Sequence, residues 1–154
     1  METINTKKHS VDKVLAHSYV VYLIFFLLAI YLDAIFGFKV FPDTFMAPVG
    51  LFFLILASVL ILSAQKTGHE FRKIKEKRVE HFHGGPYHYT RIPTQWGLFF
   101  LMLGFGVITN SFFVIVFSII SFLTAKFIFI EKQEKMLEEK YGTHYTEYKK
   151  SVKF

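Results

Sequence analysis

A polar stretch at residues 81–97 interrupts a hydrophobic background and holds the first residue types in this chain that could do chemistry. Gly84, Gly85 and Pro86 indicate a turn within it. Arg91 follows the turn, and its guanidinium is always charged and binds carboxylates and phosphates through two parallel N–H groups. We therefore expect Arg91 to contact an anionic lipid headgroup or a carboxylate ligand. The aromatic residues of this stretch are also typical of a membrane interface.

A second polar stretch runs from Glu131 to Phe154 and has the pattern of a charged helix. Gly142 is predicted to end that helix, because glycine readily adopts the left-handed conformation of a helix C-terminus. Four residues recur at three- and four-residue spacing and form one largely aromatic face. They are Leu137, Tyr141, Tyr145 and Tyr148. Taken alone, this pattern indicates an amphipathic helix that lies on a membrane surface or against the protein.

Histidines in and before the first stretch raise the alternative of a metal site. They are His69, His81, His83 and His88. The chain contains no cysteine, which excludes disulfides, cysteine nucleophiles and thiolate ligands. The histidines also lack the ordered ligand spacing that zinc sites have. We favour solvated histidines in an interfacial loop and expect no metal.

The composition indicates the elements that must position these two stretches. Hydrophobic residues make up 53% of the chain and include 20 phenylalanines, which is more apolar surface than one soluble core of this size can bury. The formal charge of +6 could suggest nucleic acid. Basic residues gather in the cytoplasmic loops of membrane proteins, however, so we expect no nucleic-acid partner.

Four apolar segments approach the roughly 20 residues that a helix needs to cross a bilayer. They lie at about 14–33, 45–64, 92–108 and 112–130. Helices are required because lipid offers no partner for an unpaired backbone group. We therefore predict an all-α, polytopic membrane protein with four transmembrane helices. A cytoplasmic amphipathic helix at 131–148 completes this single membrane domain.

The basic residues predict the orientation of the spans. The loop at 65–91 and both ends of the chain are rich in lysine and arginine, whereas the turn at 109–111 is uncharged. By the positive-inside rule, both termini and the loop at 65–91 are cytoplasmic. Gly97 and Gly104 share one face of the third span, so we expect the third and fourth spans to form a tight hairpin. The first two spans are interpreted as scaffold.

In this order, the two polar stretches resemble the isoprenylcysteine carboxyl methyltransferase and phospholipid methyltransferase superfamily. The family pattern is Gly-Pro-Tyr-x-x-x-Arg-His-Pro-x-Tyr-x-Gly, then a further glycine and Glu-Glu-x-x-Leu-x-x-x-Phe-Gly-x-x-Tyr-x-x-Tyr. The matching residues are Gly85, Pro86, Tyr87, Arg91, Pro93, Gly97, Gly104, Glu134, Leu137, Gly142, Tyr145 and Tyr148. The resemblance covers about residues 79–154, which is half of the chain.

The resemblance implies an integral membrane enzyme that uses S-adenosylmethionine to methylate a lipidated or lipophilic substrate. It implies that the polar loop and the C-terminal helix enclose the cofactor on the cytoplasmic side, while the substrate's lipid tail enters between helices. The implied cofactor contacts are Tyr87, Arg91, Pro93, Gln95, Gln133 and Glu134. Arg91 is the best candidate for contact with an anion of substrate or cofactor, and no catalytic residue is identified.

Four residues depart from the family pattern: Ile92 replaces its histidine, Gln95 its second tyrosine, Gln133 its first glutamate, and Tyr141 its phenylalanine. Isoleucine can neither donate nor accept a hydrogen bond. A carboxylate acceptor is already ionised near neutral pH, whereas an amine must first lose a proton. The departures therefore weigh more against amine methylation, and carboxyl methylation is favoured.

Two other functions stay open. A degenerate member of the family would keep the fold and bind a lipid or a partner without catalysis. A small transporter usually needs an ionisable group deep in a span, whereas Asp33 and Lys126 lie near span ends, so this function is least favoured.

Overall fold

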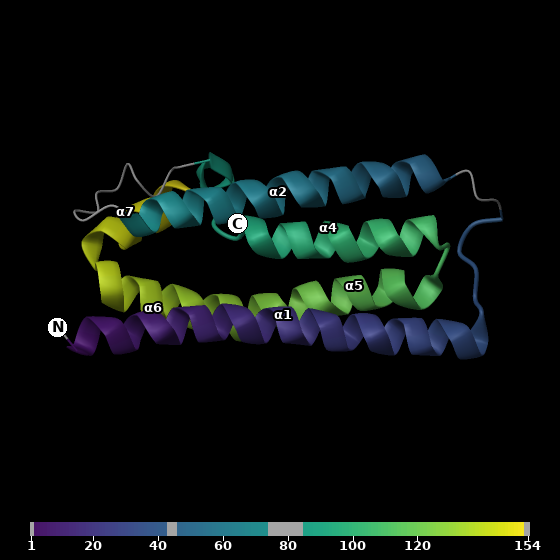
Figure 1. The fold of residues 1–154 in the computed structure, drawn as a ribbon, viewed down its shortest axis with the longest axis horizontal. Helices are drawn as coiled ribbons and strands as arrows, with labels where there is room; N and C mark the ends of the chain where they lie inside the picture. Colours follow the sequence, from purple (N-terminus) through teal and green to yellow (C-terminus); the bar gives the residue numbers. More distant parts are fainter. Residues whose placement is uncertain (1, 43–45, 74–84, 153–154) are drawn as a thin grey trace.

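The computed structural model describes residues 2–42, 46–73 and 85–152, and every regular element in these ranges is helical. The helices run side by side along one long axis (Figure 1). In chain order they are α1 (Glu2–Phe36), α2 (Ala47–Lys73), the 3₁₀ turn η2 (Gly85–His88), α4 (Pro93–Ile108), α5 (Phe112–Thr124), the π-helical turn η3 (Ala125–Ile130), α6 (Glu131–Tyr141) and α7 (Thr143–Ser151). The predicted all-α class is confirmed for the described residues.

Three helical segments are long and apolar enough to cross a membrane: Ala16–Phe36, Ala47–His69 and Phe112–Glu139. The last of these is continuous through α5, η3 and most of α6. Helix α4 is apolar but has only 16 residues. At 1.5 Å per residue it is about 24 Å long, below the roughly 30 Å of a hydrocarbon core. The prediction of four transmembrane helices is therefore supported for three.

Two segment boundaries differ from those expected. The predicted loop at 65–91 begins later, because α2 continues to Lys73. The helix continues beyond the apolar run because the residues that follow include lysine, arginine, glutamate and glutamine, which are good helix formers. The predicted helix at 131–148 is two helices, α6 and α7, which meet at Gly142 with a φ of +58°. This left-handed residue turns the chain, so α7 leaves the direction of α6 (Figure 1).

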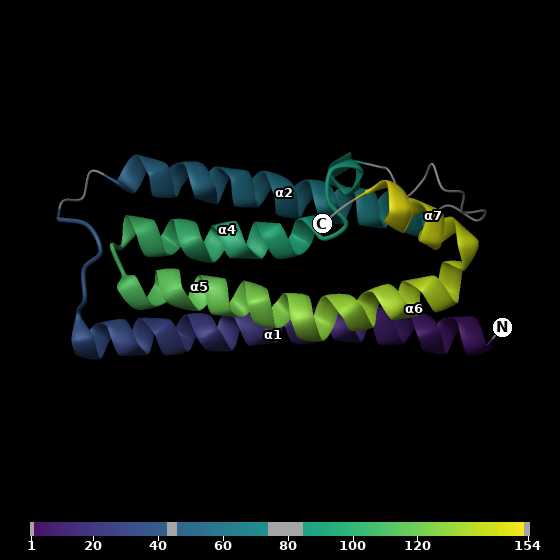
Figure 2. The same cartoon turned by 180° about the vertical axis from the view of Figure 1, so that it is seen from behind.

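The closest helix packing lies between α2 and α4. A methyl group at Gly104 would lie 2.8 Å from the Gly50 carbonyl oxygen, and one at Gly97 would lie 2.5 Å from Ile61 Cγ1. The predicted hairpin of α4 and α5 is present, but the assignment of Gly97 and Gly104 to its contact is wrong. Their face meets α2, and it is Gly106 that approaches Ile115 on α5. Figure 2 shows α2 beside α4, and α1 beside α5 and α6.

The outer faces of α1 and α2 carry large hydrophobic side chains. Leu23, Leu27, Phe52, Ile55 and Leu62 are each more than half exposed. Inside the bundle, Tyr22, Ala29, Met102, Val114 and Ala125 form a buried cluster. An apolar exterior around a small interior cluster suits contact with lipid and would be costly in water.

Candidate active site

The two polar stretches of the sequence meet at one end of the bundle. Turn η2, the start of α4, and helices α6 and α7 all lie at this end, as does the N-terminus (Figures 1 and 2). We call it the terminal end. Helix α4 begins with Pro93, whose missing N–H leaves no hydrogen bond unmade in a first turn. This arrangement brings Arg91 next to α6.

A buried ion pair joins the two stretches. Arg91 Nη1 lies 2.7 Å from Glu134 Oε1, and the two side chains are 6% and 11% exposed. Lys149 Nζ lies 2.9 Å from Glu134 Oε2 and 2.8 Å from Glu138 Oε1. Two cations and two carboxylates thus balance one another. Glu134 is held from both sides, by Arg91 before α4 and by Lys149 on α7.

Aromatic side chains fix α7 against the first polar stretch. The Tyr148 hydroxyl donates a hydrogen bond of 2.7 Å to the Tyr87 carbonyl oxygen. Tyr145, Tyr148 and Val152 are buried together, and Tyr87 and Leu137 pack against them. Leu137, Tyr145 and Tyr148 therefore pack together as predicted, but across two helices, α6 and α7, rather than along the face of one. The side chain of Tyr141, the fourth member of the predicted face, lies outside the described residues.

The titration of this cluster follows from its surroundings. Burial raises the pKa of Tyr145, and the nearby Glu134 carboxylate raises it further. Burial also raises the pKa of Tyr148. Hydrogen bonds to Glu138 and Glu134 raise the pKa of the Lys149 ammonium. The tyrosines are therefore neutral and Lys149 is charged near neutral pH.

The π-helical turn η3 aims Glu134 at Arg91. Along α5 the buried residues follow α-helical spacing and include Val114, Ser118, Ser121 and Ala125. The next buried residue is Ile130, five positions after Ala125, and Glu134 follows four positions later. A π turn adds one residue to a helical turn and so shifts every later side chain around the axis. In a regular α-helix without the π turn, Glu134 would not lie on the same buried face as Ala125.

The remaining predicted contacts differ in position. Pro93 is buried at the start of α4, and Gln133 is half-buried beside Glu134. Gln95 is 2% exposed, and its Nε2 donates a hydrogen bond of 2.9 Å to Ser18 Oγ on α1. Ile92 is buried, as its apolar side chain favours. The structure thus joins Tyr87, Arg91 and Glu134 in one region and turns Gln95 toward α1.

The sequence analysis did not identify two residues that make contacts in this region, Lys149 and Ser18. Lys149 reaches Glu134 only because the chain turns at Gly142, and no local spacing predicts that contact. Ser18 offered a signal, since a polar residue inside an apolar span usually faces the protein interior. Because Ser18 contacts Gln95, the interpretation of α1 as scaffold is incomplete.

The metal hypothesis rested partly on His81 and His83, which lie outside the described residues. Within the ranges that the structure describes, no group of three His, Asp or Glu side chains is close enough to hold a metal ion. His69 and His88 are both exposed.

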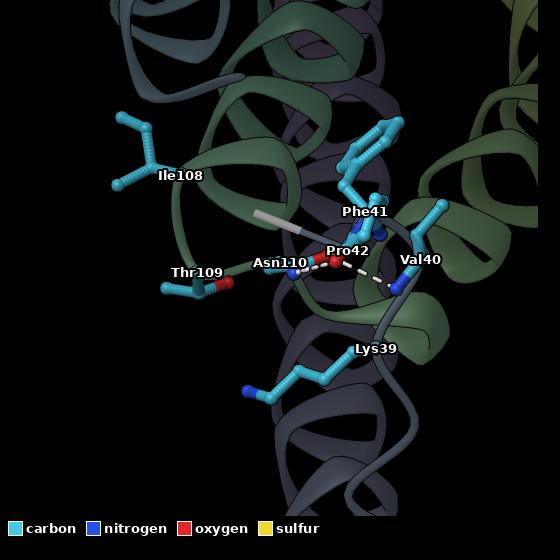
Figure 3. A pocket seen from close by; sticks show the side chains of 7 residues that line it. All are labelled: Lys39, Val40, Phe41, Pro42, Ile108, Thr109 and Asn110. Atoms are coloured by element: carbon cyan, nitrogen blue, oxygen red, sulfur yellow. Dashed lines mark hydrogen bonds between the residues drawn. The ribbon is translucent and has the colours of Figure 1, made fainter. Parts of the chain in front are cut away.

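A cavity of about 490 Å³ lies at the opposite end of the bundle, lined by residues 39–42 and 108–110 (Figure 3). Asn110 Oδ1 accepts hydrogen bonds of 2.9 Å from the backbone N–H groups of Val40 and Phe41. Its Nδ2 donates one of 2.8 Å to the Phe41 carbonyl oxygen. The Asn110 side chain therefore ties the α4–α5 turn to the segment after α1, which is a structural role far from the ion pair.

A comparison with protein families supports the resemblance. The family model described as phospholipid methyltransferase matches residues 44–144, from just before α2 into the start of α7. No curated protein and no solved structure matched the chain. The matched region contains Arg91 and Glu134 and two of the candidate membrane spans, so this is an integral membrane protein. It belongs to the phospholipid methyltransferase family, within the superfamily that also includes the isoprenylcysteine carboxyl methyltransferases.

Proposed function

We propose that this protein uses S-adenosylmethionine to methylate a lipidated or lipophilic substrate at the membrane. The observation that carries the proposal is the buried pair of Arg91 and Glu134 within the family-matching region. Family membership supports methyl transfer as the reaction class. The buried pair supports a cofactor site at the terminal end of the bundle.

The charges of the pair fit the cofactor. The methionine end of S-adenosylmethionine carries a carboxylate and an ammonium group on one carbon atom. Arg91 and Glu134 offer the complementary charges 2.7 Å apart, so their mutual contact can be exchanged for one contact with each group. Tyr87, Pro93 and Gln133 are proposed as further contacts by resemblance. Gln95 was predicted among them, but its bond to Ser18 favours another role.

We propose a carboxylate as the methyl acceptor. The cofactor supplies a methyl group on a positively charged sulfur, and the protein must mainly align the acceptor with it. Glu134 is held by Arg91 and Lys149, so it is poorly placed to take a proton from an amine. A carboxylate needs no such base, because it is already ionised near neutral pH. The basic loop and termini support a cytoplasmic location for this end.

One observation favours a second function, that of a degenerate member that binds a lipid or partner without catalysis. Ile92, only 7% exposed, stands where the family pattern has histidine, and Gln133 stands where it has glutamate. In that case the Arg91–Glu134 pair would only hold α6 against α4.

Binding of S-adenosylmethionine to the purified protein in lipid nanodiscs separates the two functions. We expect saturable binding with a dissociation constant in the range of about 1 μM to 1 mM that enzymes show for their substrates. Arg91→Ala should weaken it by roughly 10- to 100-fold, as a lost charged hydrogen bond does. Ile92→His should tighten it by restoring the family's hydrogen-bonding group.

Matched controls come from the exposed side of α6. Glu131→Gln and Lys132→Ala change charge on the same helix and should leave the cofactor affinity unchanged. No binding to the unsubstituted protein at millimolar S-adenosylmethionine would reject the enzyme function and leave the degenerate one. If Arg91→Ala and Lys132→Ala had equal effects, the proposed site would be misplaced.

A further inference from the structure

Lys149 lies at the terminal end of the bundle but beyond residue 144, where the match to the phospholipid methyltransferase family ends. Its ammonium group contacts two carboxylates of α6. Lys149 Nζ is 2.9 Å from Glu134 Oε2 and 2.8 Å from Glu138 Oε1. Glu134 and Glu138 are four residues apart, so they share one face of α6. The family match therefore assigns no role to a side chain that touches Glu134, a residue of the proposed cofactor site.

The backbone of Lys149 is fixed, whereas its ammonium group is close to water. The preceding residue, Tyr148, is buried, and its hydroxyl donates a hydrogen bond of 2.7 Å to the Tyr87 carbonyl oxygen. This contact holds α7 against the first polar stretch. The Lys149 side chain is 35% exposed, compared with 6% for Arg91. Lys149 can therefore leave Glu134 and regain contact with water by rotation of its flexible side chain, while α7 stays in place.

Each oxygen of the Glu134 carboxylate already contacts a cation. Arg91 Nη1 lies 2.7 Å from Oε1, and Lys149 Nζ lies 2.9 Å from Oε2. In the proposed cofactor complex, Arg91 turns to the carboxylate of the cofactor and Glu134 receives its ammonium group. Lys149 would still neutralise Glu134 at that point, so the incoming ammonium group would meet a carboxylate that is already paired. The cofactor gains the full attraction of Glu134 only when Lys149 leaves it.

The chemistry of a lysine side chain suits this competition. Its ammonium group carries one positive charge and three N–H donors, as the ammonium group of the cofactor does. Hydrogen bonds to Glu138 and Glu134 raise the pKa of Lys149, so it stays charged near neutral pH. Together with Arg91, these groups form two cations and two carboxylates and carry no net charge. S-adenosylmethionine has one net positive charge, and release of Lys149 to water leaves a negative charge to attract it.

We propose that Lys149 is an internal competitor of the cofactor, whose ammonium group holds the place beside Glu134 that the ammonium group of S-adenosylmethionine takes. The inference rests on the proposed function, because it concerns the regulation of the same site. The contact of Lys149 with α6 is therefore autoinhibitory. When the cofactor binds, its ammonium group contacts Glu134 and Lys149 turns to water. The demethylated product, S-adenosylhomocysteine, carries the same ammonium group, so the return of Lys149 also favours product release.

Removing the competitor should tighten cofactor binding, which calorimetry on the protein in nanodiscs measures without turnover. The probes are S-adenosylmethionine and S-adenosylhomocysteine. Lys149→Met removes the ammonium group and keeps most of the aliphatic chain. An ion pair of a side chain that is 35% exposed is weak, so the released form is a minor but substantial fraction in the unsubstituted protein. Since that fraction rises to one in Lys149→Met, we expect both ligands to bind about three- to five-fold more tightly.

Lys150→Met is the matched control, because Lys150 is the next residue of α7, is exposed, and loses the same charge. It should leave both affinities unchanged. Equal tightening by Lys149→Met and Lys150→Met would overturn the proposal, since a general change in charge would then explain both. Unchanged or weaker binding in Lys149→Met would also overturn it, because Lys149 would then support the site rather than compete for it. Lys149→Arg keeps a cation at this position and should not tighten binding.

The reactivity of Lys149 gives a second readout, in the unsubstituted protein. Sulfosuccinimidyl acetate acetylates amines in their neutral form, so an amine held in two ion pairs reacts slowly. Saturating S-adenosylmethionine should raise acetylation of Lys149 several-fold, as measured by mass spectrometry, and leave acetylation of Lys150 unchanged. Unchanged or slower acetylation of Lys149 would contradict its displacement.

Failure of the proposed function is distinguishable from failure of this inference. If the unsubstituted protein does not bind S-adenosylmethionine at millimolar concentration, the proposed function is rejected and the inference falls with it. If the unsubstituted protein binds and Lys149→Met binds no more tightly, only the inference is overturned.

Discussion

The Arg91–Glu134 pair makes a quantitative prediction about stability. At 2.7 Å and an effective dielectric constant of about 20, the Coulomb attraction is about 6 kcal/mol. Desolvation of two groups that are only 6% and 11% exposed offsets much of this. The net value of the pair is therefore small, but removing one partner leaves a buried charge and costs about 3–5 kcal/mol. We expect Glu134→Leu to cost that much.

The corresponding Arg91→Met variant should cost less, because Lys149 stays beside Glu134. In the double variant, two apolar side chains replace the pair, and we expect stability to return to within about 1 kcal/mol of the unsubstituted protein. At roughly 2–4 °C per kcal/mol, Glu134→Leu should lower the melting temperature by about 6–20 °C. Lys149→Met is the control, since the Lys149 side chain is 35% exposed and its ion pairs contribute at most about 1 kcal/mol.

The assay is thermal unfolding in nanodiscs followed by tryptophan fluorescence. Trp96 is the single tryptophan, and it lies in the first turn of α4 with its ring 4.6 Å from that of Phe122. It therefore reports on the packing of α4, which begins next to Arg91, against α5, which continues into the helix that holds Glu134. Additive losses, with the double variant at least as unstable as Glu134→Leu, would refute the reasoning, because they would show that the two charges do not compensate each other.

Three further predictions concern the elements around the site. Deleting Ile128, an exposed residue of the π turn, should leave Glu134 on the buried face and change the melting temperature by a few degrees at most. Inserting one alanine after Ile128 should instead rotate α6 by about 100° and lower stability as much as Glu134→Leu does. Equal effects of the two changes in the same melting assay would contradict the role given to η3. Gly104→Ala should destabilise more than Gly97→Ala, because the new methyl group would meet the rigid Gly50 backbone rather than the mobile Ile61 side chain, and equal melting temperatures would argue against the close α2–α4 contact. The raised pKa values of Tyr145, Tyr148 and Lys149 mean that the folded state holds these protons more tightly, so the stability they contribute is complete below pH 10.0 and is lost as the pH rises further. Melting temperatures measured from pH 8 to 11 should therefore stay level at first and then fall, and the fall should be less steep in a Tyr145→Phe, Tyr148→Phe double variant. A fall that begins below pH 9 would contradict this cause.

Local features of the sequence determined the class of the protein and the two polar stretches that meet at the terminal end. Apolar runs predict helices in lipid because each helix satisfies its own backbone hydrogen bonds, and this holds whatever the neighbours are. The two polar stretches were identified by residue type, and Arg91 and Glu134 were named within them. The apolar segment predicted at about 92–108 corresponds to α4, which begins at Pro93, and the preference of proline for a first helical turn is likewise local.

The tertiary structure decided which surfaces meet. Gly97 and Gly104 share a face by helical spacing, but spacing cannot say that α2 rather than α5 covers that face. The π turn rotates α6 relative to α5, and the left-handed Gly142 brings Lys149 back to Glu134. The hydrogen bond between Ser18 and Gln95 depends on the packing of α1 against α4, two helices that α2 separates in the sequence. Residue patterns fix what each helix can contact, and only packing selects the partner.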